Sequence, residues 1–175
     1  CRMCVTCASS TTARTCARGK FLGLHVDCLG NVGAYITGVA HFVFTTHISG
    51  CLPTIYDIPH AQVNARCVLT NTLPTGPYRG AGRPEASYLL ERLIDAAADQ
   101  IGIDAAELRR RNLIVPAKIP YTTPFGSTYD SGDFPAAFER ALALADYAGF
   151  AARRKAAKIQ GKLRGIGIVC YLEIA

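Results

Sequence analysis

Apolar and polar residues alternate in the first half of the chain, and this pattern predicts β-strands. In residues 20–28, Leu22, Leu24, Val26 and Cys28 share one face, as a strand with a period of two requires. Residues 34–44 form a second apolar stretch that we expect to be extended, and residues 63–69 alternate again. Three strands are therefore expected before residue 70, followed by a loop rich in glycine and proline over residues 71–84.

After this loop the apolar period becomes helical. Leu90, Ile94, Ala97 and Ile101 recur every three or four residues, and Gly102 follows as a helix stop. We expect N-caps at the aspartates before the next two helices, a basic helix over residues 151–160, and a strand over residues 164–175. This order indicates an α+β fold, in which helices pack on one face of a mixed sheet. The two expected N-caps are Asp104 and Asp133.

Composition restricts the class of protein. The chain has 175 residues, of which 50% are hydrophobic and 18% charged, so it can build a core and is not intrinsically disordered. No apolar run reaches membrane-spanning length. The net charge of +6 permits an anionic ligand or partner. No signal peptide is visible, so we expect a cytoplasmic protein, and because the chain stops within an apolar run we expect an internal fragment.

Residues 1–18 differ from the rest, because they are rich in cysteine and show no periodicity. We expect this segment to be irregular, and the sequence leaves open whether it is native. The spacing of Cys1, Cys4 and Cys7 could hold an iron–sulfur cluster or a metal ion. The bacterial ferredoxin run needs a fourth cysteine three residues later and then a proline, which are missing here. Free thiols are therefore favoured.

The loop over residues 76–85 carries the most informative chemistry. It joins a strand to the N-terminus of a helix, where unpaired N–H groups attract anions. Gly80 and Gly82 allow a ligand to approach the backbone, and the guanidinium of Arg79 suits an oxyanion. The alternative is a structural turn, with Arg79 in solvent or paired with Glu85. No Lys-Ser/Thr pair follows the last glycine, so the loop is not a P-loop.

Other charged residues are expected on the surface. Glu91 and Asp95 share one side of the first long helix, and we interpret them as an exposed helix face. Residues 109–111 are three consecutive arginines, which we also expect in solvent. The four histidines lack metal-ligand spacing. The basic final helix supports a second hypothesis, a non-catalytic module that binds nucleic acid or a protein partner, although aromatic residues are not interleaved with its cations.

Several collinear motifs resemble the molybdenum hydroxylase family. They are similar to the large, molybdopterin-binding subunit of xanthine dehydrogenases, aldehyde oxidases and aerobic carbon monoxide dehydrogenases. The resemblance covers residues 19–175 and does not include residues 1–18. It implies that residues 19–163 are part of the first molybdopterin-binding domain and that residues 164–175 are the first strand of the following domain. The motifs include Tyr56-Asp-Ile-Pro59, Pro77-Tyr-Arg-Gly-Ala-Gly-Arg-Pro-Glu85 and Tyr129-Asp-Ser-Gly-Asp133.

The resemblance also implies a function. Such an oxidoreductase hydroxylates aldehydes, N-heterocycles or a related small molecule, with water as the oxygen source. Its cofactor is a molybdopterin with molybdenum, expected as the cytosine dinucleotide form, and its partners are an iron–sulfur subunit and an FAD-binding subunit, without nucleic acid. The expected cofactor-binding residues are Tyr78, Arg79, Gly80 and Ala81, with Arg79 beside the molybdenum. The general-base Glu is expected downstream of residue 175, so we expect this chain to contain no catalytic residue and to be inactive alone.

Two departures from the family pattern narrow the expected chemistry. Gly80 stands where carbon monoxide dehydrogenases have a cysteine that binds copper, which argues against a molybdenum–copper site. Ala81 stands where purine-oxidising members have a phenylalanine, which implies a wider pocket and argues against xanthine as the substrate.

Overall fold

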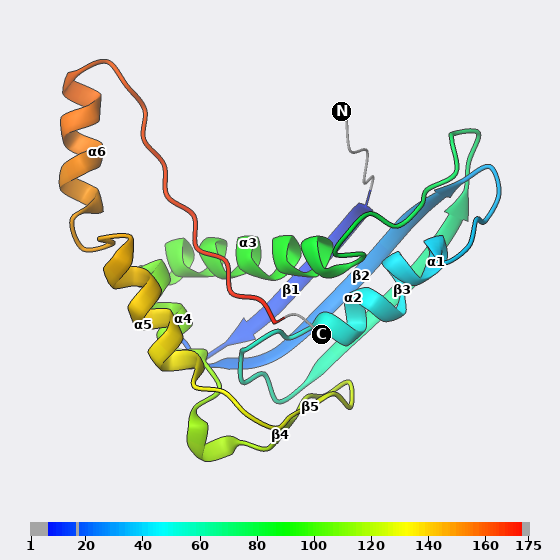
Figure 1. The fold of residues 1–175 in the computed structure, drawn as a ribbon, viewed down its shortest axis with the longest axis horizontal. Coiled ribbons are helices and arrows are strands. Elements are labelled where there is room, and N and C mark those ends of the chain that lie inside the picture. The colour runs from blue at the N-terminus through cyan, green and yellow to red at the C-terminus, as the bar shows by residue number, and fades with distance from the viewer. Residues whose placement is uncertain (1–6, 17, 173–175) are drawn as a thin grey trace.

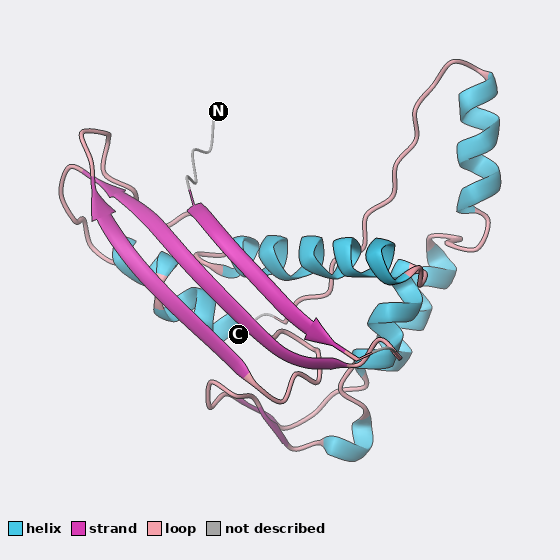
Figure 2. Ribbon diagram, turned by 180° about the vertical axis from the view of Figure 1, so that it is seen from behind, coloured by secondary structure: helices cyan, strands magenta, loops and turns pink. Residues whose placement is uncertain are grey.

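The computed structural model describes residues 7–16 and 18–172 and shows a sheet with helices on one face (Figures 1 and 2). The sheet has three strands, β1 (Cys7–Thr15), β2 (Phe21–Gly33) and β3 (Ala61–Leu69), in the order β1-β2-β3. β1 is antiparallel to β2, and β2 is parallel to β3. The α+β class and the mixed sheet predicted from the sequence are therefore confirmed.

The helices follow the strands, apart from two short ones that connect β2 to β3. Helix α3 lies across the sheet, and α5 and α6 lie beyond its C-terminal end (Figure 1). A short hairpin separates α4 from α5. The bounds are α1 (Ala40–Phe44), α2 (Thr46–Cys51), α3 (Arg83–Ile101), α4 (Ala105–Asn112), a 3₁₀ turn (Pro116–Lys118), β4 (Tyr121–Thr122), β5 (Thr128–Tyr129), α5 (Phe134–Leu144) and α6 (Phe150–Ile159).

The main core lies between the sheet and α3. Alternate residues of β2, among them Leu24 and Val26, are buried and belong to the same cluster as Leu90 and Ile94 of α3. Buried apolar residues thus recur every two positions in β2 and every three or four positions in α3, as the sequence predicted, and the two sets pack against each other. Leu22 is an exception, because it is exposed at the start of the strand.

Two sequence predictions about strands are wrong at the N-terminal side. Residues 7–15, expected to be irregular, form β1, which pairs along β2. Residues 34–44, expected to be extended, form a loop and α1. The reason is visible in the spacing of Ala40, Val43 and Phe44, which are all buried at positions i, i+3 and i+4. Cys1 and Cys4 lie outside the described residues.

The C-terminal segment also differs from its prediction. Residues 164–172 form neither a strand nor a helix, and residues 173–175 lie outside the described part of the chain. The segment returns from the end of α6 as an extended connection that crosses α3 (Figure 1). Its apolar residues reach the core at Ile168, Cys170 and Leu172 rather than through a ladder of strand hydrogen bonds. No sheet strand lies beside it, so alternation alone did not produce a strand.

Local signals place the helix ends. Asp104 accepts hydrogen bonds from the amides of Ala106 and Glu107 at 2.9 and 3.0 Å, and Asp133 accepts one from Ala136 at 3.0 Å. Both predicted N-caps are therefore confirmed. Within the described residues, no helix combines the length and the apolar character needed to cross a membrane.

Candidate functional site

The predicted cofactor loop is a tight turn at the start of α3. Three successive residues, Gly80, Ala81 and Gly82, have positive φ values of 101°, 25° and 93°. The amide of Ala81 donates to the carbonyl of Tyr78, and the amide of Arg83 donates to that of Gly80, each at 2.9 Å. Left-handed backbone favours glycine, which explains the Gly-Ala-Gly sequence at this point.

The turn is anchored to the short helices behind it. A Cβ added at Gly82 would lie 2.5 Å from Cβ of His47 in α2, so only glycine fits there. Ala81 packs against a small cluster formed by Val32, Val43 and Phe44. The side chain of Ala81 therefore contributes to this cluster, and the start of α3 is held in a fixed position.

Arg79 and Tyr78 extend from this anchored turn into solvent. Tyr78 is 77% exposed, and Arg79 is also exposed. Within the described residues, Arg79 forms no ion pair and no side-chain hydrogen bond, so the alternative pairing with Glu85 is absent. Among the same residues, no backbone hydrogen bond uses the N–H group of Gly80 or Gly82. The turn thus presents an unpaired cation and the amide of Gly80. Gly82, in contrast, is buried against α2, so the predicted approach of a ligand to its backbone is not seen.

Buried polar atoms without partners lie near the same turn. One carboxylate oxygen of Glu85, in the first turn of α3, is buried and accepts no hydrogen bond within the described chain. Nδ1 of His47 is also buried and has no hydrogen-bond partner within the described chain, and His47 packs against Gly82. Buried polar groups are normally paired. A bound group that carries N–H donors and anionic oxygens would therefore fit this donor and acceptor set.

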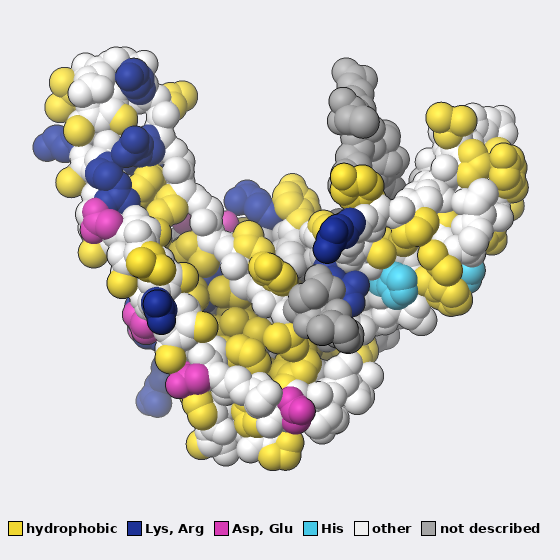
Figure 3. All heavy atoms as spheres, viewed as in Figure 1, with side chains coloured by type: hydrophobic (Ala, Val, Ile, Leu, Met, Phe, Trp, Pro, Cys, Tyr) yellow, Lys and Arg dark blue, Asp and Glu magenta, His cyan; other side chains and the backbone are white. Residues whose placement is uncertain are grey.

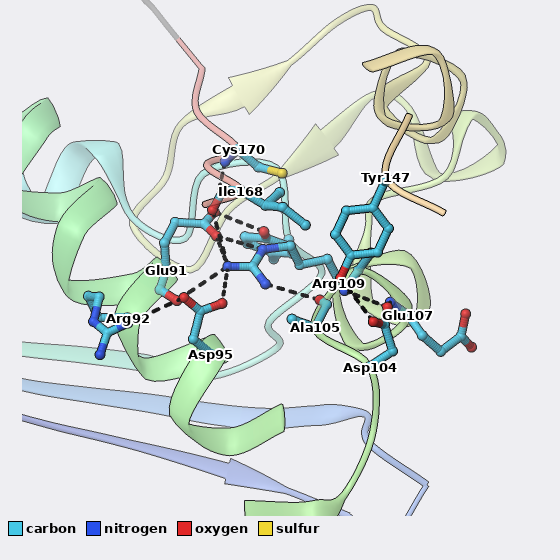
Figure 4. Close-up of polar contacts among 12 residues, drawn as sticks. Glu91, Arg92, Asp95, Asp104, Ala105, Glu107, Arg109, Tyr147, Ile168 and Cys170 are labelled. Atoms are coloured by element: carbon cyan, nitrogen blue, oxygen red, sulfur yellow. Dashed lines mark hydrogen bonds and ion pairs between the residues drawn. The ribbon is translucent and has the colours of Figure 1, made fainter. Parts of the chain in front are cut away.

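A second polar cluster lies at the middle of α3 and was not predicted (Figure 4). The guanidinium of Arg109 in α4 is fully buried. Its Nη2 lies 2.6 Å from Oε2 of Glu91 and 2.9 Å from Oδ1 of Asp95. It also donates to the carbonyl of Ile168 at 3.2 Å. The prediction that Glu91 and Arg109 lie on exposed helix faces is therefore wrong.

Glu91 joins this ion pair to the C-terminal segment. Its Oε1 accepts from the hydroxyl of Tyr56 at 2.8 Å and from the amide of Cys170 at 2.9 Å. Burial raises the pKa of Glu91, against the opposing effect of the Arg109 charge. Burial is the largest influence on the pKa of Arg109 and would lower it, but the charge of Glu91 and the hydrogen bonds to Glu91 and Asp95 act together with Tyr56 to raise it. The cluster holds four chain segments together, and we interpret it as structural.

A signal for this cluster was present in the sequence. Glu91 lies three residues before Ile94 and seven before Ala98, on the buried stripe of α3. An acid on an apolar stripe needs a buried partner, although the sequence does not name Arg109 as that partner. Arg110 and Arg111 are not buried, which agrees with the prediction that they lie in solvent. Both also form ion pairs with Glu107, which was not predicted.

Other candidate residues remain apart from the loop. His25 pairs with Asp27 at 3.6 Å and contacts Asn64 at 3.1 Å on β2 and β3. The described residues contain no group of three side chains suited to a metal ion. A cavity of about 350 Å³ lies between the end of α2 and the β4–β5 hairpin, and its lining residues, such as Cys51 and Tyr129, do not include the predicted loop.

Comparison with known proteins decides the family. Residues 9–113 match the family model of the molybdopterin cofactor-binding domain. The chain belongs to this family. The match includes β2, β3, α3 and the loop between them, and it begins within β1. The prediction that residues 1–18 carry no resemblance is therefore wrong for residues 9–18.

Similar proteins confirm the resemblance to molybdenum hydroxylases. The chain is 37% identical to the carbon monoxide dehydrogenase large chain of Hydrogenophaga pseudoflava over 161 residues, which cover 89% of this chain and 20% of the relative. It is 30% identical to the nicotine 6-hydroxylase large subunit of Paenarthrobacter nicotinovorans over 164 residues, which cover 90% and 19%. The chain thus spans about a fifth of the length of these curated relatives.

A solved structure agrees with this result. Quinoline 2-oxidoreductase from Pseudomonas putida 86 is similar in fold with a TM-score of 0.76 at 28% identity. The similarity covers 87% of this chain and 20% of that chain. The predicted fold class, a part of a molybdopterin-binding domain, is confirmed.

Proposed function

We propose that the chain forms the Arg79-bearing part of the cofactor site in the large subunit of a molybdenum hydroxylase. The observation that carries this proposal is the turn at Gly80–Gly82. This turn lies within the family match and presents an exposed, unpaired Arg79 beside the Gly80 amide at a helix N-terminus. We propose N-heterocycles or aldehydes as substrates. Two similar proteins, a nicotine 6-hydroxylase and a quinoline 2-oxidoreductase, support the first class.

Each residue of the turn has a separate role in binding the cofactor. Arg79 places a positive charge where anionic oxygens of the cofactor would lie, and the amide of Gly80 adds a donor that requires no rearrangement. The unpaired oxygen of Glu85 would accept a hydrogen bond from an N–H group of a pterin ring. When bound, the molybdopterin supplies the redox chemistry. The chain itself supplies positive potential and orientation.

The finer cofactor and partner assignments are part of the same proposal. The cofactor is the cytosine dinucleotide form of molybdopterin. Electrons leave through iron–sulfur clusters and FAD on partner subunits, and the enzyme is cytoplasmic. The cofactor form and the partners are what the resemblance to molybdenum hydroxylases implies, and the location rests on the lack of a visible signal peptide. The family match supports the molybdopterin part of these assignments.

Two residues of the turn set the metal and the substrate in this proposal. Gly80 has no side chain to ligate copper, so the site contains molybdenum alone. Ala81 turns its methyl group into the Val32, Val43 and Phe44 cluster, so no aromatic ring from this position packs on a substrate. Metal analysis of the full-length enzyme should find molybdenum without stoichiometric copper. Stoichiometric copper would contradict the assignment of Gly80.

The central experiment replaces Arg79 in the full-length enzyme. We expect Arg79→Ala to lower turnover by about 100-fold or more, as loss of a single oxyanion donor does in other enzymes. The matched control is Arg92→Ala, because Arg92 is exposed on α3 and makes only a 3.5 Å contact with Asp95. Both variants should fold normally by circular dichroism. Unchanged turnover in Arg79→Ala would contradict the proposal.

A further inference from the structure

Helix α6 is largely exposed. It has no buried residue, and it projects from the body of the molecule (Figures 1 and 2). Ile159 at its end is 80% exposed, and Leu163 just after it is 99% exposed. A helix of ten residues is marginal in water when no side chain is buried. Its surface therefore needs a partner.

The charge of the chain is concentrated on this arm, which we define as residues 150–164. The arm contains no acidic residue and six basic ones. The rest of the chain has thirteen basic and thirteen acidic residues, so its charges cancel. The net charge of +6 therefore resides on the arm. Arg153 pairs with Asp146 at the end of α5. Within the described residues, no ion pair involves the other five: Arg154, Lys155, Lys158, Lys162 and Arg164.

Apolar and basic side chains of the arm occupy neighbouring stripes. Ala152, Ala156 and Ile159 follow one another at spacings of four and three, so they share one face of the helix. Lys155 borders this face. Figure 3 shows basic and hydrophobic side chains together along the projecting arm. The complementary surface must therefore offer an apolar centre with acidic residues at its edge.

We propose that the arm docks permanently on an acidic-edged, apolar surface of the same large-subunit polypeptide. This inference rests on the proposed function, since the curated relatives are about five times as long as the matched region. A permanent cover suits the arm, because a transient partner would leave Ile159 and Leu163 in water for part of the time. A surface of the same polypeptide meets this requirement without any dependence on concentration.

Nucleic acid and membrane are poorer partners for this face. Proteins that bind single strands interleave cations with stacking aromatics. The one aromatic residue of the arm, Phe150, already lies under the guanidinium of Arg153, with 5.9 Å between its ring centroid and Cζ. Membrane-surface helices use large apolar anchors, whereas two of the three stripe residues here are alanines.

Photo-crosslinking of the full-length enzyme tests the docking. A photoreactive phenylalanine analogue is placed at Ile159, and the control site is Gln62 of β3, which is exposed on the sheet. We expect Ile159 to crosslink within its own polypeptide, to a peptide with more acidic than basic residues. A crosslink to another polypeptide or to nucleic acid, or no crosslink, would overturn the proposal. Because crosslinking does not depend on turnover, its failure is distinguishable from loss of molybdenum or activity.

Charge reversal gives a second measurement. The double variant Lys155→Glu/Lys158→Glu should lower the Ile159 crosslink yield by about tenfold, because like charges then face each other across the interface. Arg66→Glu on β3 is the matched control and should leave the yield unchanged. An unchanged yield in the double variant would overturn the charge argument. If the double variant does not fold, thiol labelling of Ile159→Cys in the otherwise native enzyme tests the docking instead. Slow labelling supports a covered arm, and fast labelling overturns the proposal.

Discussion

The guanidinium of Arg109 shows how a single residue can connect distant parts of the chain. It contacts α3 through Glu91 and the C-terminal segment through Ile168. Removing one member of such a buried pair leaves the other charge without compensation, which costs far more than the net value of the pair.

We therefore predict that Arg109→Met lowers the free energy of unfolding by about 3–5 kcal/mol. The double variant Glu91→Gln/Arg109→Met should lose less than the single variant, because the buried charge is gone and the glutamine oxygen can still accept from Tyr56 and Cys170. Denaturant titration of the three proteins measures both values. A double variant less stable than Arg109→Met would contradict the prediction, because Glu91 would then stabilise the fold without Arg109.

Two cysteines should differ strongly in reactivity. Backbone hydrogen bonds around Cys16 lower its pKa, while burial raises the pKa of Cys170 to about 11. Because the thiolate is the reactive form, iodoacetamide at pH 8 should modify Cys16 well before Cys170. Peptide mapping by mass spectrometry gives the two rates. As a control, the two cysteines should react at similar rates in denaturant. Similar rates in the folded chain would contradict the burial of Cys170.

At the scale of elements, the N-cap of α4 is a specific test. Asp104 caps the helix and also accepts a hydrogen bond from the hydroxyl of Tyr147 at 2.9 Å. Asp104→Ala should therefore lower the free energy of unfolding by about 1–2 kcal/mol. Asp99→Ala, an exposed position within α3, should have little effect. Thermal unfolding of both variants provides the comparison, and equal losses would argue against the cap.

Elements with a local signal could be predicted, and elements fixed by distant contacts could not. α3 has an uninterrupted apolar stripe and a following glycine, and the structure places it within one residue of its prediction. β1 has no apolar alternation, because its place is set by pairing with β2. The candidate loop was found from its glycines and Arg79, whereas the Glu91–Arg109 contact depends on how α3 and α4 pack.

At the scale of the whole molecule, buried acids determine the alkaline limit of stability. Burial raises the pKa of Cys170 to about 11 and that of Tyr129 to about 12, from ordinary values of 9.0 and 10.0. The folded state therefore holds these protons in a pH range where the unfolded chain releases them. Stability is fully present below pH 9 and decreases as pH rises through 11.

We predict that Cys170 contributes about 3 kcal/mol of this loss by pH 11, since each unit of pKa shift corresponds to roughly 1.4 kcal/mol. Denaturant midpoints at pH 8 and pH 10.5 measure the slope, and Cys170→Ala should flatten it. A slope that is identical in the two proteins would contradict the contribution of this thiol.

The contacts between the C-terminal segment and the first long helix have a consequence for synthesis on the ribosome. Glu91 and its partner amide at Cys170 are 79 residues apart, so the helix must leave the exit tunnel long before its polar shell can close. Until then, the carboxylate of Glu91 lacks the amide donor of Cys170, and the guanidinium of Arg109 lacks the carbonyl acceptor of Ile168. The nascent chain therefore acquires its final packing late, when residues 168–170 have emerged and returned to α3.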